Sequence, residues 1–262
     1  MTLEVLTCIM IFISGLVLGS FYNVVGYRLP NNMSIIYPRS HCPNCNHELK
    51  FYELIPVISY IFLLGKCKVC KKRISIFYPF FEIITGILFL LSYFVFGLSM
   101  NFFISITFIS ILLIISISDI RYYIIPDEVI VVGSIILLIE FIINSIILNT
   151  GIINGVAIPL LNGLGSFAIL YLFKAFGDLV FQRESLGGGD IKLLFVIGLV
   201  LGFDMSIVTI FIASFIALPL SVISLIKNDN NVLPFGPYLS IAAILVLLSN
   251  LDLNMILQFF TK

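Results

Sequence analysis

Residues 102–119 read FFISITFISILLIISISD, an apolar run that ends on the carboxylate of Asp119. A helix of about 20 apolar residues crosses a bilayer. An ionisable side chain at membrane depth is costly and marks a functional site by default. Asp190 has a related setting, because it follows three glycines (187–189) and opens another apolar stretch. We therefore expect a membrane protein that carries two aspartates where apolar segments meet polar loops.

The composition supports a chain that crosses the membrane several times. Of its 262 residues, 60% are hydrophobic and only 11% are charged, whereas about a quarter are charged in soluble domains. The mean hydropathy is +1.18. We predict an all-α integral membrane fold with about eight transmembrane helices and a cytoplasmic loop, in which the sixth and eighth segments are short for a full span. The eight segments are Leu3–Phe21, Pro79–Gly97, Phe102–Ser118, Val129–Leu148, Val156–Gly177, Ile191–Phe203, Met205–Ile226 and Tyr238–Leu248.

The distribution of basic residues predicts the orientation. The first polar loop holds Arg28, Arg39, Lys50, Lys66, Lys68, Lys71, Lys72 and Arg73. With eight spans, Arg121, Lys174, Arg183, Lys192 and Lys227 fall on the same side and Lys262 on the other. The positive-inside rule then places both termini outside and the loops of the two aspartates in the cytoplasm. The N-terminus has no basic stretch before its apolar run, so we expect an anchor and not a cleaved signal peptide.

Two C-x2-C pairs in the first loop, Cys42/Cys45 and Cys67/Cys70, predict a metal site. They are 21 residues apart, one more than is usual for a four-thiolate zinc site. A disulfide framework is the competing interpretation, but cytoplasmic thiols are kept reduced, which favours structural Zn²⁺. The two histidines beside the first pair are expected to be solvated neighbours and not ligands.

The loop divides the chain into three expected parts: a first transmembrane helix at 1–21, the cytoplasmic loop at 22–78 and a helical core at 79–262. The basic residues of the loop are compatible with contact to anionic membrane lipid, with docking of a charged substrate, or with both. No nucleic-acid partner is expected.

The two aspartates predict acid–base chemistry. Two carboxyl groups at close range cannot both ionise, so one keeps its proton while the other is charged. The charged carboxylate can take a proton from water, and the protonated one can supply the acid for a peptide carbonyl and its leaving amine. The glycines at 187–189 are expected to allow close backbone approach and unusual backbone conformations. Lys192 is placed in the same active-site loop.

Each aspartate also has a structural interpretation. Asp119 could form a helix-end ion pair with Arg121, and Asp190 could be a helix N-cap. Asp127 is a reserve candidate for the first catalytic position. Glu140 lies inside an apolar segment and needs a buried partner or a polar cavity, which the sequence does not identify.

Several motifs, in order along nearly the whole chain, resemble the bacterial type 4 prepilin peptidases, which are membrane aspartic proteases with a Gly-x-Gly-Asp signature. The resemblance rests on Gly19–Pro30 (GSFYNVVGYRLP), the two cysteine pairs, Tyr52–Tyr60 (YELIPVISY), Tyr78–Glu82 (YPFFE), Asp119 with Ile125-Pro126-Asp127, Leu186–Lys192 (LGGGDIK) and Pro234–Pro237 (PFGP). Any one of these matches is weak, but their shared order is highly specific.

The resemblance implies an enzyme with two activities in the bacterial cytoplasmic membrane. One cuts the basic leader from prepilins or pseudopilins on the cytoplasmic side, after a glycine and often before a phenylalanine, with Asp119 and Asp190 as the catalytic pair. The other methylates the new N-terminal amine with S-adenosylmethionine. Arg28 and Glu53 are candidates for the methyl-donor site, with a structural salt bridge as the alternative for both.

Two other classes of function stay open at this stage. A proton-coupled transporter would use Asp119, Asp190 and Glu140 as a relay. It would distribute carboxylates across the membrane, whereas the sequence places the two aspartates at one face, which disfavours this class. A membrane-tethered binding module would use the cysteine loop to recruit a partner, and it would leave the two aspartates unexplained.

Overall fold

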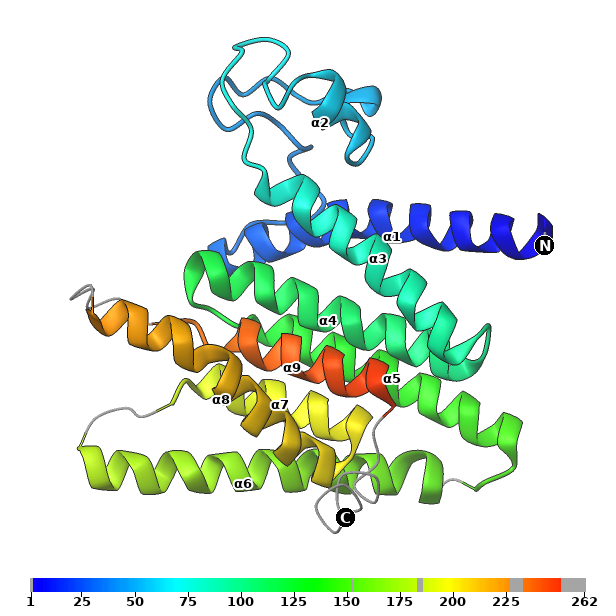
Figure 1. Cartoon of the computed structure of the whole chain (residues 1–262), viewed down its shortest axis with the longest axis vertical. Coiled ribbons are helices and arrows are strands. Elements are labelled where there is room, and N and C mark those ends of the chain that lie inside the picture. The colour runs from blue at the N-terminus through cyan, green and yellow to red at the C-terminus, as the bar shows by residue number, and fades with distance from the viewer. Residues whose placement is uncertain (1, 152, 183–185, 227–232, 251–262) are drawn as a thin grey trace. The chain divides into compact units, whose positions relative to one another are not determined.

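A computed structural model describes residues 2–151, 153–182, 186–226 and 233–250 of the chain (Figure 1). These residues are helical apart from their connections, and the strand-like pairing among them is limited to two isolated bridges in the cysteine loop. The main helices are α1 (Thr2–Arg28), α3 (Phe77–Phe96), α4 (Met100–Tyr122), α5 (Asp127–Leu148), α6 (Ile158–Phe181), α7 (Gly188–Leu201), α8 (Phe203–Ile226) and α9 (Gly236–Ser249). Each predicted apolar segment therefore corresponds to one main helix, with small differences at the ends, and the all-α membrane fold is confirmed.

Six of these helices are long and apolar enough to cross a membrane, namely α1, α3, α4, α5, α6 and α8. The short sixth and eighth segments are α7 and α9, each of 14 residues. A helix of that length covers about 21 Å, less than the roughly 30 Å of a hydrocarbon core. The first helix is longer than its predicted segment: it continues past Phe21 to Arg28, just before Pro30.

The chain divides into two compact units, Met1–Gly97 and Leu98–Lys262. The sequence predicts three parts, with boundaries after residues 21 and 78, and the boundary between the two units lies elsewhere. The observed position differs because α3 packs along α1 and so joins the unit of the cysteine loop. Glycines allow this close contact: a Cβ on Gly15 would lie 2.6 Å from the Cα of Gly86, and a Cβ on Gly19 would lie 2.7 Å from the Thr85 hydroxyl.

The loop of the first unit is held together by short elements. It contains the 3-10 turns η1 (Leu29–Asn31) and η2 (Phe51–Glu53) and the short helix α2 (Ile58–Phe62). Glu82 of α3 is buried and accepts a hydrogen bond of 2.7 Å from the Val57 N–H, at the start of α2. Val57 has a φ of 62°, which is strained for a β-branched residue. The contact between Glu82 and Val57 thus ties the loop to α3.

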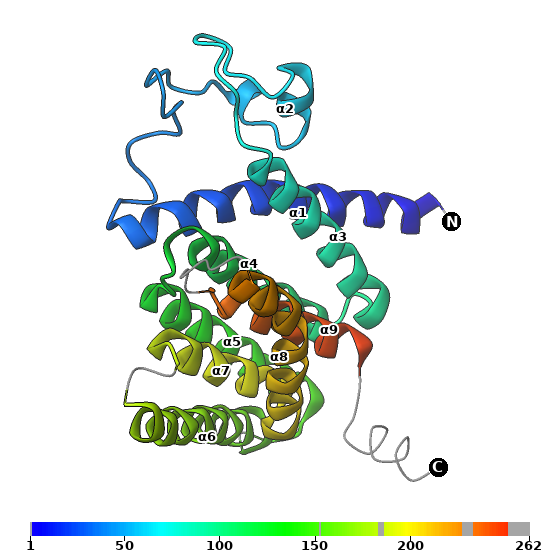
Figure 2. The same ribbon diagram turned by 60° about the vertical axis from the view of Figure 1, so that its left-hand side comes forward.

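In the second unit, α4 is the central helix. It packs on α5 and α9, while α7 packs on α6, α8 and α9 (Figures 1 and 2). Phe108, Ile109 and Leu112 of α4 are fully buried, as expected of a helix that is apolar on all sides. Three of its serines, Ser105, Ser110 and Ser116, bond to carbonyls of the same helix, for example Ser116 to the Leu112 carbonyl at 2.7 Å, so that their hydroxyls are satisfied. A short π-helical turn, η3 (Ile153–Ala157), precedes α6.

Candidate active site and metal centre

The first aspartate lies on the last turn of α4. Asp119 is only 6% exposed. Tyr123 follows the helix in a left-handed conformation, with φ of 57°, and its N–H donates to the Asp119 carbonyl at 2.9 Å. The hydroxyl of Ser118 donates to the Ile124 carbonyl at 2.5 Å. These bonds close the helix and turn the chain towards α5, which leaves the Asp119 carboxylate buried at the turn.

The second aspartate is the third residue of α7. Gly187 precedes the helix as its N-cap in an extended conformation, and Asp190 is 8% exposed. A Cβ on Gly189 would lie 2.8 Å from the Ile125 Cβ, whereas a Cβ on Gly188 would meet nothing within 4 Å. The expected close approach therefore applies at Gly189. The expected unusual backbone conformation is wrong, since none of the three glycines has a positive φ.

The start of α9 completes the site. Among the described residues, the donor to the Asp119 carboxylate is the backbone N–H of Gly236, at 3.0 Å from Oδ2. A Cβ on Gly236 would lie 2.7 Å from the same oxygen, so a larger residue in this place would displace the carboxylate. Pro237 follows directly, at a position where a helix has no partner for its N–H and tolerates proline.

These three helix ends surround a cavity of about 550 Å³. The C-terminal end of α4 and the N-terminal ends of α7 and α9 lie at the same end of this unit (Figures 1 and 2). The cavity is lined by Asp119, Tyr123, Ile125, Leu186, Gly187, Gly188, Gly189, Asp190, Leu233, Pro234 and Phe235. Both predicted aspartates, with the three glycines, thus line one cavity.

Other predicted residues lie outside the lining of the cavity. Lys192 binds Asp127 through Nζ, at 2.7 and 2.8 Å from its two carboxylate oxygens, and both side chains are about half exposed. The ion pair joins the N-terminal part of α7 to the first turn of α5. Asp127, the reserve candidate, is therefore held by this ion pair at the surface, and Lys192 does not reach into the lined space.

The structure does not support the structural roles that the sequence offered for the two aspartates. The hydrogen bond to Asp119 comes from Gly236 and not from Arg121, and the N-cap of α7 is Gly187 and not Asp190. Glu140 has a partner that the sequence did not identify, because it accepts a hydrogen bond of 2.8 Å from the Thr107 hydroxyl of α4.

The sequence did not identify residues 233–236 as part of the site. The motif Pro234–Pro237 was noticed only as part of a resemblance, and it contains no titratable side chain. Its contribution to the site is a backbone N–H and the apolar side chains of the cavity wall. The available signal was a glycine followed by a proline at the start of an apolar helix, which is typical of an N-terminus but does not reveal what the N-terminus faces.

The four cysteines of the first unit form a separate centre. Their sulfurs all lie within 4.8 Å of one another. Cys42 Sγ is 3.8 Å from Cys70 Sγ, and Cys45 Sγ is 3.9 Å from Cys67 Sγ. A tetrahedral ion with bonds of about 2.3 Å separates its sulfurs by about 3.8 Å, whereas a disulfide would need about 2.05 Å. The four thiols therefore fit one metal ion and are not paired as disulfides.

The two cysteine turns have the same backbone hydrogen bonds, 25 residues apart. In the first turn the Cys42 N–H donates to the His47 carbonyl and the Asn46 N–H to the Cys42 carbonyl. In the second, the Cys67 N–H donates to Lys72 and the Lys71 N–H to Cys67. Asn46 and Lys71 both have a positive φ, 54° and 59°. Each turn is thus one copy of the same local structure, which presents two sulfurs to a shared point.

The sulfurs differ in their protonation. Backbone N–H groups of Cys70 and Val69 lower the pKa of Cys67 to about 6. The His47 N–H acts on Cys45 in the same direction, but burial and the neighbouring sulfurs outweigh it and raise the pKa of Cys45 to about 11. Several thiolates at this distance repel one another. A bound cation would remove that repulsion, so the arrangement of the four thiols is compatible with a metal ion in this respect also.

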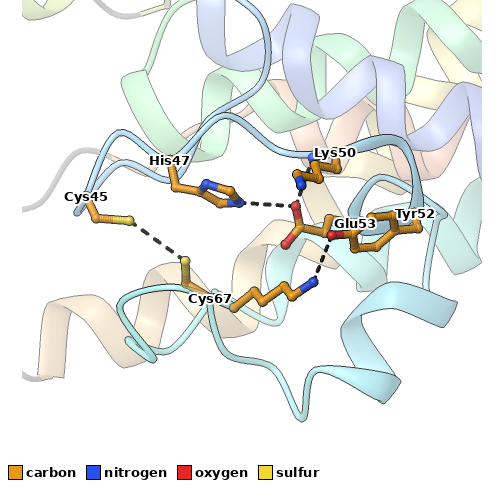
Figure 3. A network of polar contacts seen from close by, with 7 residues as sticks. Cys45, His47, Lys50, Tyr52, Glu53 and Cys67 are labelled. Carbon is orange, nitrogen blue, oxygen red and sulfur yellow. Dashed lines mark hydrogen bonds and ion pairs between the residues drawn. The ribbon is translucent and has the colours of Figure 1, made fainter.

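Glu53 links the first cysteine turn to the rest of the loop (Figure 3). It accepts hydrogen bonds from the Lys50 N–H at 2.8 Å and from His47 Nε2 at 3.2 Å. Burial alone would raise the pKa of Glu53, but Lys50, His47 and Lys68 together lower it below its ordinary value. His47 is therefore not the solvated neighbour that we expected, since its ring contacts Glu53 and only 22% of its side chain is exposed.

Arg28 is also buried in the loop, at the end of α1. Its guanidinium donates to the Ser34 carbonyl at 2.9 Å and to the Pro38 carbonyl at 2.6 Å. Two of its donors thus hold the chain as it leaves the first helix. One Glu53 oxygen, Oε1, is buried and has no hydrogen-bond partner among the described residues.

Comparison with known proteins covers both units. Residues 13–96 match the family model described as "Bacterial Peptidase A24 N-terminal domain", and residues 106–222 match "Type IV leader peptidase family". The first match contains the four cysteines, and the second contains both aspartates. No solved structure matches the chain.

Curated relatives match over nearly the full length. A protein of Bacillus subtilis named prepilin leader peptidase/N-methyltransferase is 34% identical, over 96% of this chain and 97% of its own. Proteins of the same name from Stutzerimonas stutzeri and Pseudomonas putida are 31% and 30% identical, over 89% and 87% of this chain and 88% and 85% of their own. The resemblance predicted from the motifs is thereby confirmed, and the chain belongs to the type IV leader peptidase family.

Proposed function

We propose that Asp119 and Asp190 act as a proton-sharing pair that hydrolyses a peptide bond in the leader of a prepilin or pseudopilin. Membership of the family makes the protein a membrane peptidase. The observation that supports these two residues is that both buried carboxylates line one cavity although they lie 71 positions apart in the chain. Gly187, Gly188 and Gly189 form the active-site loop beside them.

The chemistry follows from two carboxyl groups around one space. Because two like charges at close range disfavour each other, the pair holds one proton at neutral pH. The ionised carboxylate takes a proton from a water molecule as that water attacks the peptide carbonyl, and the protonated carboxyl donates to the carbonyl oxygen. The leaving amine then receives a proton as the C–N bond breaks. These steps use only the two aspartates and one water.

The proposed substrate suits the place of the cavity. A prepilin has a basic leader followed by an apolar helix, so its scissile bond rests at the cytoplasmic face of the membrane. We place the cavity on that face of the bacterial cytoplasmic membrane, with both termini outside, because 13 of the 14 basic residues lie on the side of the aspartate loops. The short helices α7 and α9 begin at the cavity. The polar groups of their N-terminal ends would therefore lie below the lipid surface there. Basic loop residues would contact anionic lipid.

We also propose that Cys42, Cys45, Cys67 and Cys70 hold one structural Zn²⁺. The support is the near-tetrahedral spacing of the four sulfurs. The proposed cytoplasmic side is also the one on which thiols are kept reduced. A four-thiolate shell leaves no open position for substrate, so the ion would stabilise the loop and would not take part in hydrolysis.

For methyl transfer, we propose a site in the first unit that includes Glu53. Bound S-adenosylmethionine would supply the methyl group for the new N-terminal amine. The buried and unpartnered Oε1 of Glu53 is compatible with a contact to the amino or hydroxyl groups of this donor. The fit is poorer for Arg28, the other candidate, because its guanidinium is already bonded to two loop carbonyls.

The alternative functions have less support. A proton-coupled transporter is not supported, because the relatives are named as peptidases and methyltransferases. In addition, Thr107, the partner of Glu140, is 12 residues before Asp119 on α4, about 18 Å along the helix. A binding module would leave the shared cavity of the two aspartates unexplained.

One experiment tests peptidase and methyltransferase activity together. The purified protein is incubated with a prepilin and a labelled methyl donor, and leader loss and N-terminal methylation are measured. We expect both products with the parental chain. With Asp119→Ala or Asp190→Ala we expect neither from the full-length prepilin, and methylation alone from a prepilin supplied without its leader. Leader cleavage at the parental rate in both variants would show that the aspartates are not the catalytic pair.

A further inference from the structure

The two aspartates of the cavity differ in what donates to them. Asp119 Oδ2 accepts the Gly236 N–H at 3.0 Å, in a buried environment. Asp190 is equally buried, but among the described residues its carboxylate has no hydrogen bond like the one that Gly236 donates to Asp119. A hydrogen bond from an N–H stabilises the charged form of a carboxylate. The hydrogen bonds therefore stabilise the charged form of Asp119 more than the charged form of Asp190.

The start of α9 is built to deliver this N–H. The first N–H groups of a helix have no partner within the helix, and Gly236 is the first residue of α9. The space where its Cβ would stand is 2.7 Å from Asp119 Oδ2, so any larger residue would push the carboxylate away. Pro237 carries no N–H, so the next position does not offer a competing donor.

Asp190 also lies near a helix N-terminus, because it is in the first turn of α7. Its Oδ2 is 3.0 Å from the position that a Cβ on Gly187 would take, so the carboxyl folds back over the N-cap. The field of a helix end favours an anion, but a direct hydrogen bond to a charged group is the stronger effect. The balance thus favours charge on Asp119.

We propose that Asp119 is the ionised member of the pair and Asp190 the member that carries the proton, with Gly236 as the positioning residue that sets this division. This inference rests on the peptidase function proposed above. Asp119 takes a proton from water, the water oxygen bonds to the peptide carbon, and Asp190 gives its proton to the carbonyl oxygen. Asp119 then passes its proton to the amine as the C–N bond breaks, and Asp190 recovers a proton from the former carbonyl oxygen. Both carboxyls return to their starting states.

Among the described residues, the charged or titratable groups on the helix ends around Asp119, besides Asp190, include the following. Tyr123 shares the cavity, and α4 itself carries Arg121. The first turn of α5 contributes Asp127 and Glu128, of which Asp127 is paired with Lys192 of α7. The first turn of α9 adds Tyr238. These groups are the same in the parental chain and in a Gly236 variant, so a comparison of the two isolates the N–H.

The pH dependence of leader cleavage separates the two possible assignments. The acid limb of kcat/KM reports the first ionisation of the pair and the basic limb the second. If Asp119 is the ionised member, its N–H donor stabilises both the singly and the doubly charged pair, so its loss moves only the first ionisation. If Asp119 carried the proton, the loss would move only the second.

Gly236→Ala is the test variant, because its Cβ displaces the carboxylate from the N–H. We expect the acid limb to move to higher pH by about one unit, with the basic limb unchanged. A shift of the basic limb, or of neither limb, would overturn the assignment. Ser240→Ala is the control on the same helix: its buried hydroxyl has no described partner, and both limbs should stay in place.

If Gly236→Ala is inactive, infrared spectroscopy decides, because it needs no turnover. We follow the C=O stretch of the protonated carboxyls against pH in the parental chain and in Gly236→Ala, each as a difference from the double variant Asp119→Asn/Asp190→Asn. In Gly236→Ala we expect loss of the first proton to move to higher pH by about one unit and loss of the second to stay in place. Any other pattern overturns the assignment. The peptidase proposal fails separately, if alanine at both positions leaves leader cleavage intact. If the alanine variants of the two aspartates lose cleavage but the pH limb or the infrared band does not change as expected, only the division of roles between Asp119 and Asp190 is rejected.

Discussion

The cysteine centre and the aspartate cavity of this protein are assembled in different ways. The four cysteines lie within 29 consecutive residues, in two turns that repeat the same hydrogen bonds. The cavity is instead formed by the end of α4, the start of α7 and the start of α9, which lie between positions 119 and 236 of the chain. The first centre is local structure and the second is tertiary structure. The difference predicts how each centre responds to mutation.

The largest effect is expected from the aspartates. Asp119→Asn and Asp190→Asn should each lower the rate of leader cleavage by about 1,000-fold or more, because acid–base catalysis by a positioned group contributes roughly 100- to 10,000-fold. Both variants should keep the zinc content of the parental chain, since the cysteine turns form without the cavity. Cleavage kinetics and metal analysis on the same preparations check this. Loss of zinc in an aspartate variant would contradict the independence of the two centres.

The next effect concerns the cysteine turns. Cys67→Ser should weaken zinc binding by more than about 100-fold, which is beyond the cost of losing an outer-shell partner. Competition with a chromophoric chelator under reducing conditions measures the affinity. Cys8→Ser is the matched control, because Cys8 lies in α1 outside the cluster, and it should retain one zinc per chain. A parental protein without zinc would reject the metal site itself.

A smaller effect is expected where the second unit depends on close helix packing. A Cβ on Gly198 of α7 would lie 2.1 Å from the Ser166 hydroxyl and 2.6 Å from the Ser166 Cβ on α6. Overpacking of this kind costs about 1–3 kcal/mol, so Gly198→Ala should lower the unfolding temperature in detergent.

Two variants test whether this contact is the cause. Gly188→Ala, with nothing within 4 Å of its Cβ, should unfold at the parental temperature. Adding Ser166→Gly to Gly198→Ala should restore part of the lost stability. No loss in Gly198→Ala, or no recovery in the double variant, would show that α6 and α7 do not pack as described.

The smallest effect is expected at the surface of the cysteine loop. Arg39 and Glu48 form an ion pair of 3.2 Å, and their side chains are 82% and 57% exposed. Exposed pairs contribute about 0–1 kcal/mol. Glu48→Gln should therefore leave zinc affinity and protease resistance of the loop unchanged within error. A clear loss in either measurement would mean that the loop depends on its surface charges and not only on the cysteine turns.

Most of the fold could be read from the sequence because membrane helices are apolar over their whole length. Each of the eight segments is one helix, and the two short ones are the two that begin at the cavity. The boundary between the two compact units does not coincide with a boundary of the three predicted parts. Hydropathy identifies α3 as a span but not its neighbour, and the fit of Gly86 against Gly15 of α1 is a property of two helices together.

The sequence by itself determined the membrane class, the two aspartates and the four-cysteine turns. Each of these depends on the type of residue and on spacing within a short stretch, as in the C-x2-C pairs. Only the tertiary structure decided that Asp127 binds Lys192 at the surface while Asp119 faces the cavity. It also placed the Gly236 N–H on Asp119. A backbone N–H is present at almost every residue, so its role depends on what the folded chain brings within 3 Å.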